Sequence, residues 1–204
     1  VGSTGKPVLV STGLATLVDL AVAVDTLRDA GASDIVLLKC STAYPAPVEE
    51  VNLNTIPNLR QTFGLEVGFS DHTLGIGAAV AAVSLGATVI EKHIKLDDGG
   101  KAVDDFFSMS CAEFAVMTTE IHRARAALGS VQYGVTAASR NNLNGRRSLY
   151  VSAPIRAGER FTSENIRSVR PGFGLNTRYY EIVLGRRAAH DLDIGDRLTW
   201  EVIK

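Results

Sequence analysis

Short apolar runs alternate with stretches of helical periodicity along the first 129 residues of the chain. The runs have the length of buried strands, and the stretches between them place their apolar residues on one face of a helix. The predicted strands span residues 7–10, 35–38, 66–69 and 87–90, and the predicted helices span residues 17–30, 55–63, 74–85 and 110–128. Strict alternation of strands and helices predicts a parallel α/β sheet that is covered on both faces.

Four strand–helix pairs make up half of a closed (β/α)₈ TIM-type barrel, which takes roughly 250 residues. Four strands alone would leave two sheet edges open to mispairing. The chain begins with Val1 instead of methionine, and a predicted strand follows almost at once. We therefore expect a fragment that contains one half of such a barrel, with a small open sheet as the alternative.

The pattern changes after a polar stretch. Residues 130–145 are rich in glycine, asparagine and serine, which indicates a linker. Residues 146–204 contain short β-type runs and many turns, and within them residues 155–166 recur as residues 192–203 at an offset of 37. Two copies predict a small β-rich domain with two similar strand–turn units, each with a glycine in its tight turn. The predicted domains are therefore 1–129 and 146–204.

Composition narrows the class of protein. The 204 residues are 46% hydrophobic and 21% charged, as in an ordinary globular protein with a core, and the formal net charge is −1. This charge argues against nucleic-acid binding and membrane-surface binding, and no apolar run approaches the roughly 20 residues that span a bilayer. The two cysteines, Cys40 and Cys111, are too few for a disulfide framework and favour reduced thiols in a cytoplasm.

Two histidines follow two of the predicted strands. His72 ends the cluster at residues 70–72, and His93 ends the cluster at residues 91–93. Parallel strands bring both clusters to the same carboxyl-terminal edge of the sheet, where proteins of this class place their active sites. Two imidazoles at that edge could share one divalent metal, although each could instead cap a strand or pack against its neighbours.

A second candidate lies in the C-terminal part. Arg170 stands at the head of the sequence R-P-G-F-G, in a loop between the two copies of the repeat. A guanidinium in such a loop is suited to binding a carboxylate or a phosphate. The alternative is a surface arginine in a turn.

Five motifs resemble the sialic acid synthase family. They are S-T-G at 11–13, C-S-T-A-Y-P-A-P at 40–47, G-F-S-D-H-T-L-G at 68–75, G-A-T-V-I-E-K-H at 86–93 and R-P-G-F-G at 170–174. The resemblance implies the second half of a (β/α)₈ barrel joined to a C-terminal antifreeze-like (SAF) domain. It also implies metal-dependent condensation of phosphoenolpyruvate with an N-acetylated sugar, which gives a nonulosonic acid and phosphate.

Within this family the chain is most similar to the pseudaminic acid synthases, whose sugar is of the 2,4-diacetamido-2,4,6-trideoxy-altrose type. The D-F-F-S-M run at 105–109 and the R-R-S-L-Y-V run at 146–151 support this branch. The sequence departs from the family pattern at Ala102-Val103-Asp104, where G-P-D is usual. N-acetylneuraminate or legionaminate synthesis is the first alternative. A non-catalytic binding or assembly fragment is the second.

The resemblance implies a role for each matching residue. His72 and His93 would hold Mn²⁺ or Mg²⁺ and act in catalysis, and Asp104 would act near the sugar hydroxyls. Ser11 and Ser70 would bind the phosphate of phosphoenolpyruvate, and Thr42 and Tyr44 would contact the sugar. Arg170 would reach the other subunit of a domain-swapped homodimer. Ser11 and Tyr44 could instead be structural, and Asp97, Asp98 and Asp105 compete with Asp104. Asp71 and Glu91 would orient the histidines or balance the charge of Lys92. If the protein begins at Val1, we expect little or no activity.

Overall fold

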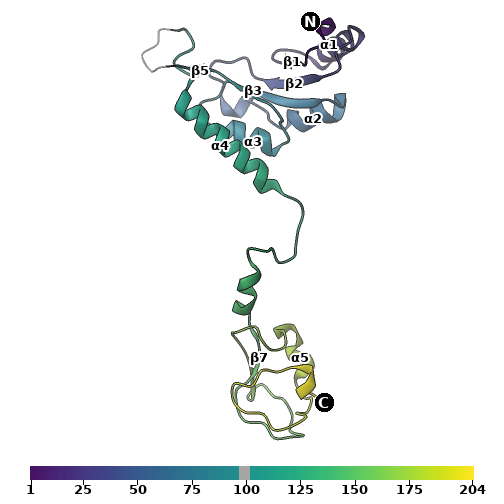
Figure 1. Ribbon diagram of the computed structural model, residues 1–204, viewed down its shortest axis with the longest axis vertical. Helices are drawn as coiled ribbons and strands as arrows, with labels where there is room; N and C mark the ends of the chain where they lie inside the picture. Colours follow the sequence, from purple (N-terminus) through teal and green to yellow (C-terminus); the bar gives the residue numbers. More distant parts are fainter. Residues whose placement is uncertain (97–101) are drawn as a thin grey trace. The chain divides into compact units, whose positions relative to one another are not determined.

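A computed structural model describes residues 1–96 and 102–204, and the chain divides into two compact units, Val1–Ser130 and Val131–Lys204 (Figure 1). The first unit runs in the order η1 (Gly2–Thr4), β1 (Val8–Ser11), α1 (Leu17–Asp29), β2 (Ile35–Cys40), η2 (Val48–Glu50), α2 (Thr55–Phe63), β3 (Glu66–Asp71), α3 (Gly77–Ser84), β4 (Ile90–Lys92), β5 (Ile94–Lys95), β6 (Met109–Ser110) and α4 (Cys111–Leu128). The predicted alternation of strands and helices is therefore present.

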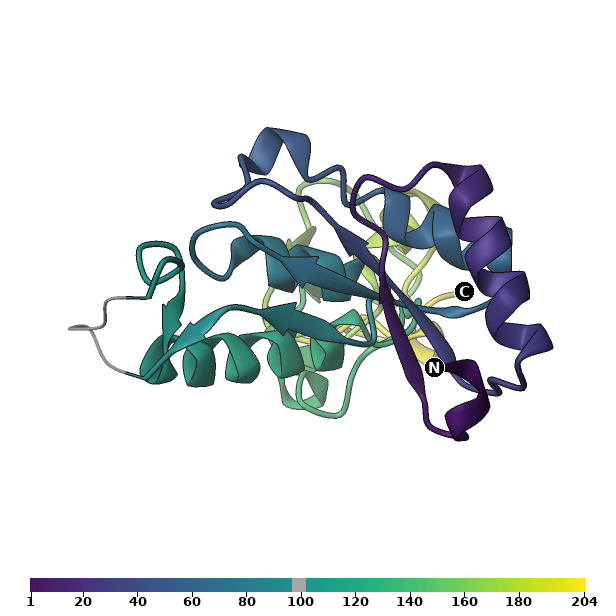
Figure 2. The ribbon, with the colours of Figure 1, turned by 90° about the horizontal axis from the view of Figure 1, so that it is seen from above.

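The strands β1, β2, β3 and β4 form one parallel sheet in the order of the chain (Figure 2). Strand residues of one face, among them Leu37 and Phe69, form a core with residues of α1, α2 and α3. The helix α4 packs on α3 and on Ile90, which lies opposite Phe69 and so belongs to the same face.

The helices α1 to α4 therefore pack against one face of the sheet. Right-handed connections between strands in unbroken order place every helix on the same side. That is the arrangement of a barrel wall, whose other face lines the interior. Leu9 of β1 belongs to this interior face and is 49% exposed in the described structure.

Local chemistry fixes the ends of these helices. Thr16 and Ser110 cap α1 and α4, and each forms a reciprocal capping box with an acidic residue three positions later. Gly64 ends α2 in the left-handed conformation that glycine adopts without strain. The helix α3 starts at Gly77, later than predicted, because Gly75 turns the chain with a φ of 73°. None of the helices in the described residues is long and apolar enough to cross a membrane.

The second unit contains η3 (Arg140–Gly145), β7 (Ser148–Val151), β8 (Ile166–Val169), η4 (Thr177–Tyr179), α5 (Tyr180–Val183) and η5 (Trp200–Val202). The strands β7 and β8 are antiparallel, and the segment predicted as a linker contains η3. Buried apolar residues such as Leu149, Phe161 and Leu198 form a separate core. The unit is thus small and β-rich.

The internal repeat is visible in this unit. Ile155 and Leu192, which open the two copies, exchange two main-chain hydrogen bonds of 2.9 and 2.8 Å. The carboxylates of Glu159 and Asp196 each accept a hydrogen bond of 2.8 Å from the main-chain N–H three residues earlier. The glycine before each carboxylate has a positive φ, 82° in the first copy and 93° in the second. The two copies therefore form equivalent tight turns, as the sequence predicts.

Candidate functional site

The two predicted histidines come together at one edge of the sheet. Ser70 lies opposite Glu91 and Asp71 lies opposite Lys92 in the parallel pairing of β3 and β4, so the next residue of each strand is a histidine. The ring centroids of these two histidines are 5.1 Å apart, and their planes make an angle of 65°. The register of the sheet thus produces the pair without any contribution from a loop.

A main-chain oxygen fixes the orientation of His72. The Nδ1 atom of this buried side chain lies 2.7 Å from the oxygen of Ser41, which follows the neighbouring strand β2. A carbonyl oxygen only accepts hydrogen bonds, so Nδ1 must carry the proton. Nε2 is then the ring nitrogen of His72 that remains available to a metal or another ligand.

Aromatic rings surround the histidine pair. The ring of Tyr44 lies 4.3 Å from that of His72 and 5.9 Å from that of His93, between centroids. Phe107 lies 4.8 Å from the ring of His93 and 5.7 Å from that of Tyr44. We call these four residues the ring cluster. Sequence reasoning missed Phe107: the D-F-F-S-M run was noticed as a motif, but nothing in it assigned a position to the second phenylalanine.

Asp104 lies near one histidine of the pair. Its Oδ2 atom lies 3.6 Å from Nδ1 of His93, and its side chain is about half exposed. Asp105, one of its competitors, accepts a hydrogen bond from the main chain of Ala102 within the same turn. Asp97 and Asp98 lie outside the described residues. Among the described residues, Asp104 is therefore the carboxylate that approaches a histidine of the pair.

A buried ion pair supports the ends of both strands. Oδ2 of Asp71 lies 2.9 Å from Nζ of Lys92, and both side chains are almost completely buried. The main chain of Thr73 donates to Oδ1 of Asp71 and accepts from Lys92. Side chains alternate along a strand, so this pair faces the helices and the histidines face the other side. Asp71 thus balances the charge of Lys92 and does not orient His72.

Ser70 and Glu91 share the face of the histidines. The hydroxyl of Ser70 donates to Oε1 of Glu91 at 2.6 Å. This contact directs the hydroxyl proton to a carboxylate, and an anion that approached Ser70 would meet the negative charge of Glu91. To bind a phosphate, the hydroxyl of Ser70 has to rotate away from Glu91.

The remaining predicted residues occupy other strand ends. Ser11 is the last residue of β1. Thr42 follows β2 and packs closely on Gly13, because a Cβ added to Gly13 would lie 2.6 Å from the methyl group of Thr42. Arg170 belongs to the second unit, directly after β8, and is exposed. The hydroxyl of Ser148 stabilises the loop of Arg170 by donating to the oxygen of Pro171 and accepting from the N–H of Gly174.

The donor set fits part of a metal site. In the described part of the chain, no three His, Cys, Asp or Glu side chains are grouped as a metal would require. The histidine pair supplies two imidazole rings, and the contact of Nδ1 of His72 with Ser41 leaves Nε2 of that ring available to a cation. Two imidazoles with oxygen donors in the other positions suit Mn²⁺ better than a closed zinc site. The residues thus fit a cation that takes its other ligands from water or substrate.

Comparison with known proteins assigns the family. The NeuB family matches residues 1–133, and the SAF domain matches residues 146–204. The chain belongs to the NeuB family. Its first unit is accordingly a parallel α/β half-barrel of the NeuB type, and the antiparallel unit that follows is the SAF domain.

Relatives of the NeuB family match nearly the whole chain. Pseudaminic acid synthase from Campylobacter jejuni (strain 81-176) is 42% identical over 193 residues, which are 95% of this chain and 56% of that protein. N,N'-diacetyllegionaminic acid synthase from C. jejuni (strain NCTC 11168) is 39% identical over 90% of this chain and 56% of that protein. The structure is similar to the crystal structure of the spore coat polysaccharide biosynthesis protein SpsE from Bacillus subtilis, with a TM-score of 0.60 and 33% sequence identity. The match covers all of this chain and 62% of that one. The chain spans little more than half the length of these curated relatives.

Proposed function

We propose that this chain contains the metal-binding half of a synthase that joins phosphoenolpyruvate to an acetamido sugar. The single observation that supports it is the adjacency of His72 and His93, with ring centroids 5.1 Å apart at the carboxyl-terminal edge of a NeuB half-barrel. Several relatives add support, because they are named as synthases of pseudaminic and diacetyllegionaminic acid.

The proposed reaction forms one carbon–carbon bond and breaks one carbon–oxygen bond. C3 of phosphoenolpyruvate bonds to the aldehyde carbon of the open-chain sugar, and the aldehyde oxygen takes up a proton. Water adds at C2, and phosphate leaves with the oxygen that joined it to C2. The products are a 2-keto nonulosonic acid and inorganic phosphate. Mn²⁺ or Mg²⁺, when bound, would supply Lewis-acid polarisation of the aldehyde.

The chain's own residues would hold and orient the reactants. His72 and His93 would bind the cation, with the hydrogen bond from His72 to Ser41 keeping Nε2 turned toward it. Tyr44 borders this pair, so its hydroxyl and ring would contact the sugar. Asp104, beside His93, would accept hydrogen bonds from sugar hydroxyls.

Phosphoenolpyruvate would bind at neighbouring strand ends. Ser11 and Ser70 would donate hydrogen bonds to its phosphate, the latter after its hydroxyl leaves Glu91. Arg170 of one subunit would bind substrate in the barrel of a partner subunit, in a domain-swapped homodimer. Thr42 would contact the sugar and help to select it.

The proposed sugar is 2,4-diacetamido-2,4,6-trideoxy-altrose, which leads to pseudaminic acid. The identities to the pseudaminic and legionaminic synthases differ little, 42% against 39%, so the sugar must be determined by assay. The complete gene product is incubated with phosphoenolpyruvate, Mn²⁺ and, in separate reactions, the acetamido sugar precursor of pseudaminate, of legionaminate or of N-acetylneuraminate. The release of inorganic phosphate is measured.

We expect phosphate release that depends on the altrose sugar, stops with a chelator and returns with Mn²⁺. Preference for N-acetylmannosamine or for the legionaminate precursor would change the sugar assignment and keep the reaction. No sugar-dependent phosphate release from the complete gene product would contradict the synthase and favour the binding or assembly role.

A further inference from the structure

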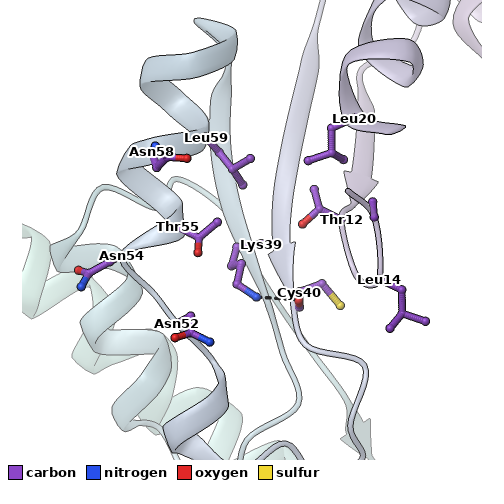
Figure 3. Close-up of a pocket in the computed structure, with 11 residues that line it drawn as sticks. Thr12, Leu14, Leu20, Lys39, Cys40, Asn52, Asn54, Thr55, Asn58 and Leu59 are labelled. Carbon is purple, nitrogen blue, oxygen red and sulfur yellow. Dashed lines mark hydrogen bonds between the residues drawn. The ribbon is translucent and has the colours of Figure 1, made fainter. Parts of the chain in front are cut away.

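A polar cavity of about 600 Å³ lies between α1 and α2, at the ends of β1 and β2 (Figure 3). Its lining consists of Thr12, Leu14, Ala15, Leu20, Lys39, Cys40, Asn52, Asn54, Thr55, Asn58 and Leu59. This volume is within the range of small-molecule sites. None of the residues proposed for the synthase site lines it.

The cavity and the histidine pair lie on opposite faces of the sheet. Lys39 is paired in register with Phe69, whose ring belongs to the core beneath the helices. The next pair along the strands contains Ser70, which faces the histidine side with Glu91. A molecule bound at Lys39 is therefore separated from the histidines by the sheet itself.

Lys39 is the one charged side chain among the described residues that line the cavity. It is half-buried, and its Nζ atom donates to the main-chain oxygen of Cys40 at 2.8 Å (Figure 3). No carboxylate in residues 1–96 or 102–204 forms an ion pair with it. Burial lowers the pKa of this ammonium. An ammonium has three donors, so it retains the capacity to bind an anion.

The opposite wall of the cavity supplies neutral hydrogen-bonding groups. Asn52, Asn54 and Asn58 have exposed amides, which both donate and accept, and Thr55 adds a hydroxyl. The helix α2 begins at Thr55, and its first turn contains no acidic residue. The positive end of this helix dipole therefore adds to the charge of Lys39 at the same cavity.

We propose that this cavity binds a small organic anion, with its carboxylate or phosphate on Lys39 and its hydroxyl or acetamido groups on the three asparagines. Charge fixes the anionic group, because the lining offers a cation and no carboxylate. The asparagine amides indicate the rest of the ligand, because an amide can both donate hydrogen bonds to hydroxyl and acetamido groups and accept hydrogen bonds from them. The product of the proposed reaction is an acid of this class. The choice of a nonulosonic acid as ligand rests on the proposed function, whereas the anion site does not.

The test titrates three probes into the complete gene product and follows heat and the side-chain amide signals of Asn52 and Asn58 by NMR. The probes are N-acetylneuraminic acid, inorganic phosphate and the neutral sugar N-acetylmannosamine. We expect the acid, the phosphate or both to shift these signals, and the neutral sugar to leave them unchanged. Binding of the acid alone identifies a carboxylate ligand, and binding of phosphate alone identifies a phosphate ester.

Two variants separate the cavity from other anion binding. Lys39→Met keeps most of the length of the side chain and removes its charge, so affinity should fall about tenfold to a hundredfold. Asn58→Asp, on an exposed helix position, adds a carboxylate to the lining of the cavity that contains Lys39 and should weaken anion binding similarly. The melting temperature of each variant is measured first and should stay within a few degrees of the wild type. If Lys39→Met unfolds, Asn58→Asp alone serves as the test.

His72→Ala should leave the shifts of the Asn52 and Asn58 amide signals at their wild-type values, because His72 does not line the cavity. The proposal is overturned if neither anion binds at about 10 mM, a concentration that detects affinities near 1 mM. It is also overturned if the neutral sugar binds equally well, or if both cavity variants bind with wild-type affinity.

Discussion

The Nδ1 atom of His72 lies 2.7 Å from the main-chain oxygen of Ser41, on the segment that follows the neighbouring strand. A main-chain acceptor cannot be lost by substitution of a side chain, so the tautomer of His72 follows from the pairing of β2 and β3. Nε2 is then the atom available for a ligand. The fold itself thus prepares one of the two proposed metal ligands.

Asp71→Asn tests the ion pair behind the histidines. The change leaves the ammonium of Lys92 almost completely buried without its partner, so the first unit should lose about 3–5 kcal/mol of unfolding free energy. Urea unfolding of that unit measures the loss. Glu66→Gln is the matched control, because Glu66 is on the same strand and pairs with Arg60 at the surface. It should cost no more than about 1 kcal/mol. Equal losses in the two variants would contradict the role of the buried pair.

Phe107→Ala tests the ring cluster. The ring is 5% exposed and packs on His93, so truncation should cost about 3–5 kcal/mol of stability and lower kcat by loosening the histidine. Phe106→Ala is the control one position earlier, where the ring is 71% exposed. It should change stability by about 0.5 kcal/mol or less. The account fails here if the two truncations have the same effect on both quantities.

Mixed subunits test the proposed place of Arg170. His72→Ala and Arg170→Ala are each expected to be inactive when prepared alone. If the arginine acts in the partner's barrel, a heterodimer of the two variants contains one intact site. Random re-association of equal amounts should then restore about a quarter of wild-type phosphate release. If Arg170 acts within its own subunit, mixing restores nothing.

Asp191 makes the SAF unit sensitive to acid. The main-chain N–H of Ala157 and the guanidinium of Arg156 lower the pKa of Asp191. A carboxyl whose pKa is lower in the folded state stabilises the fold above its unfolded pKa, and this contribution is lost as the pH falls through the folded pKa. Asp191→Asn should therefore lower the melting temperature of this unit at pH 7 and flatten its decline below about pH 4. Identical melting profiles from about pH 2 to 7 would contradict this assignment.

Much of the fold follows from local patterns in the sequence. The helix α2 starts at Thr55 and ends at Phe63 as predicted, because an apolar face and a terminal glycine mark both limits. The positions of His72 and His93 at one edge follow from two strands of similar phase joined by one helix. The repeat in the second unit was also readable, since its two turns use the same residue types.

Other features depend on which side of the sheet a residue faces. Continuous apolar strands predict a sheet that is covered on both faces, and they do not show which face carries the helices. The same ambiguity concealed that Asp71 faces the helices and that Lys39 opens into a cavity there. Phe107 lies in an irregular segment without periodicity, and only the tertiary structure places it on His93.

The most direct test of the account is the binding of Mn²⁺ to the complete gene product, measured by calorimetry. We predict one Mn²⁺ per chain, with affinity reduced about a hundredfold or more by either His72→Ala or His93→Ala. His122→Ala, an exposed histidine on α4, should bind as the wild type does. Wild-type Mn²⁺ affinity in both site variants would contradict the claim that these two imidazoles share one cation.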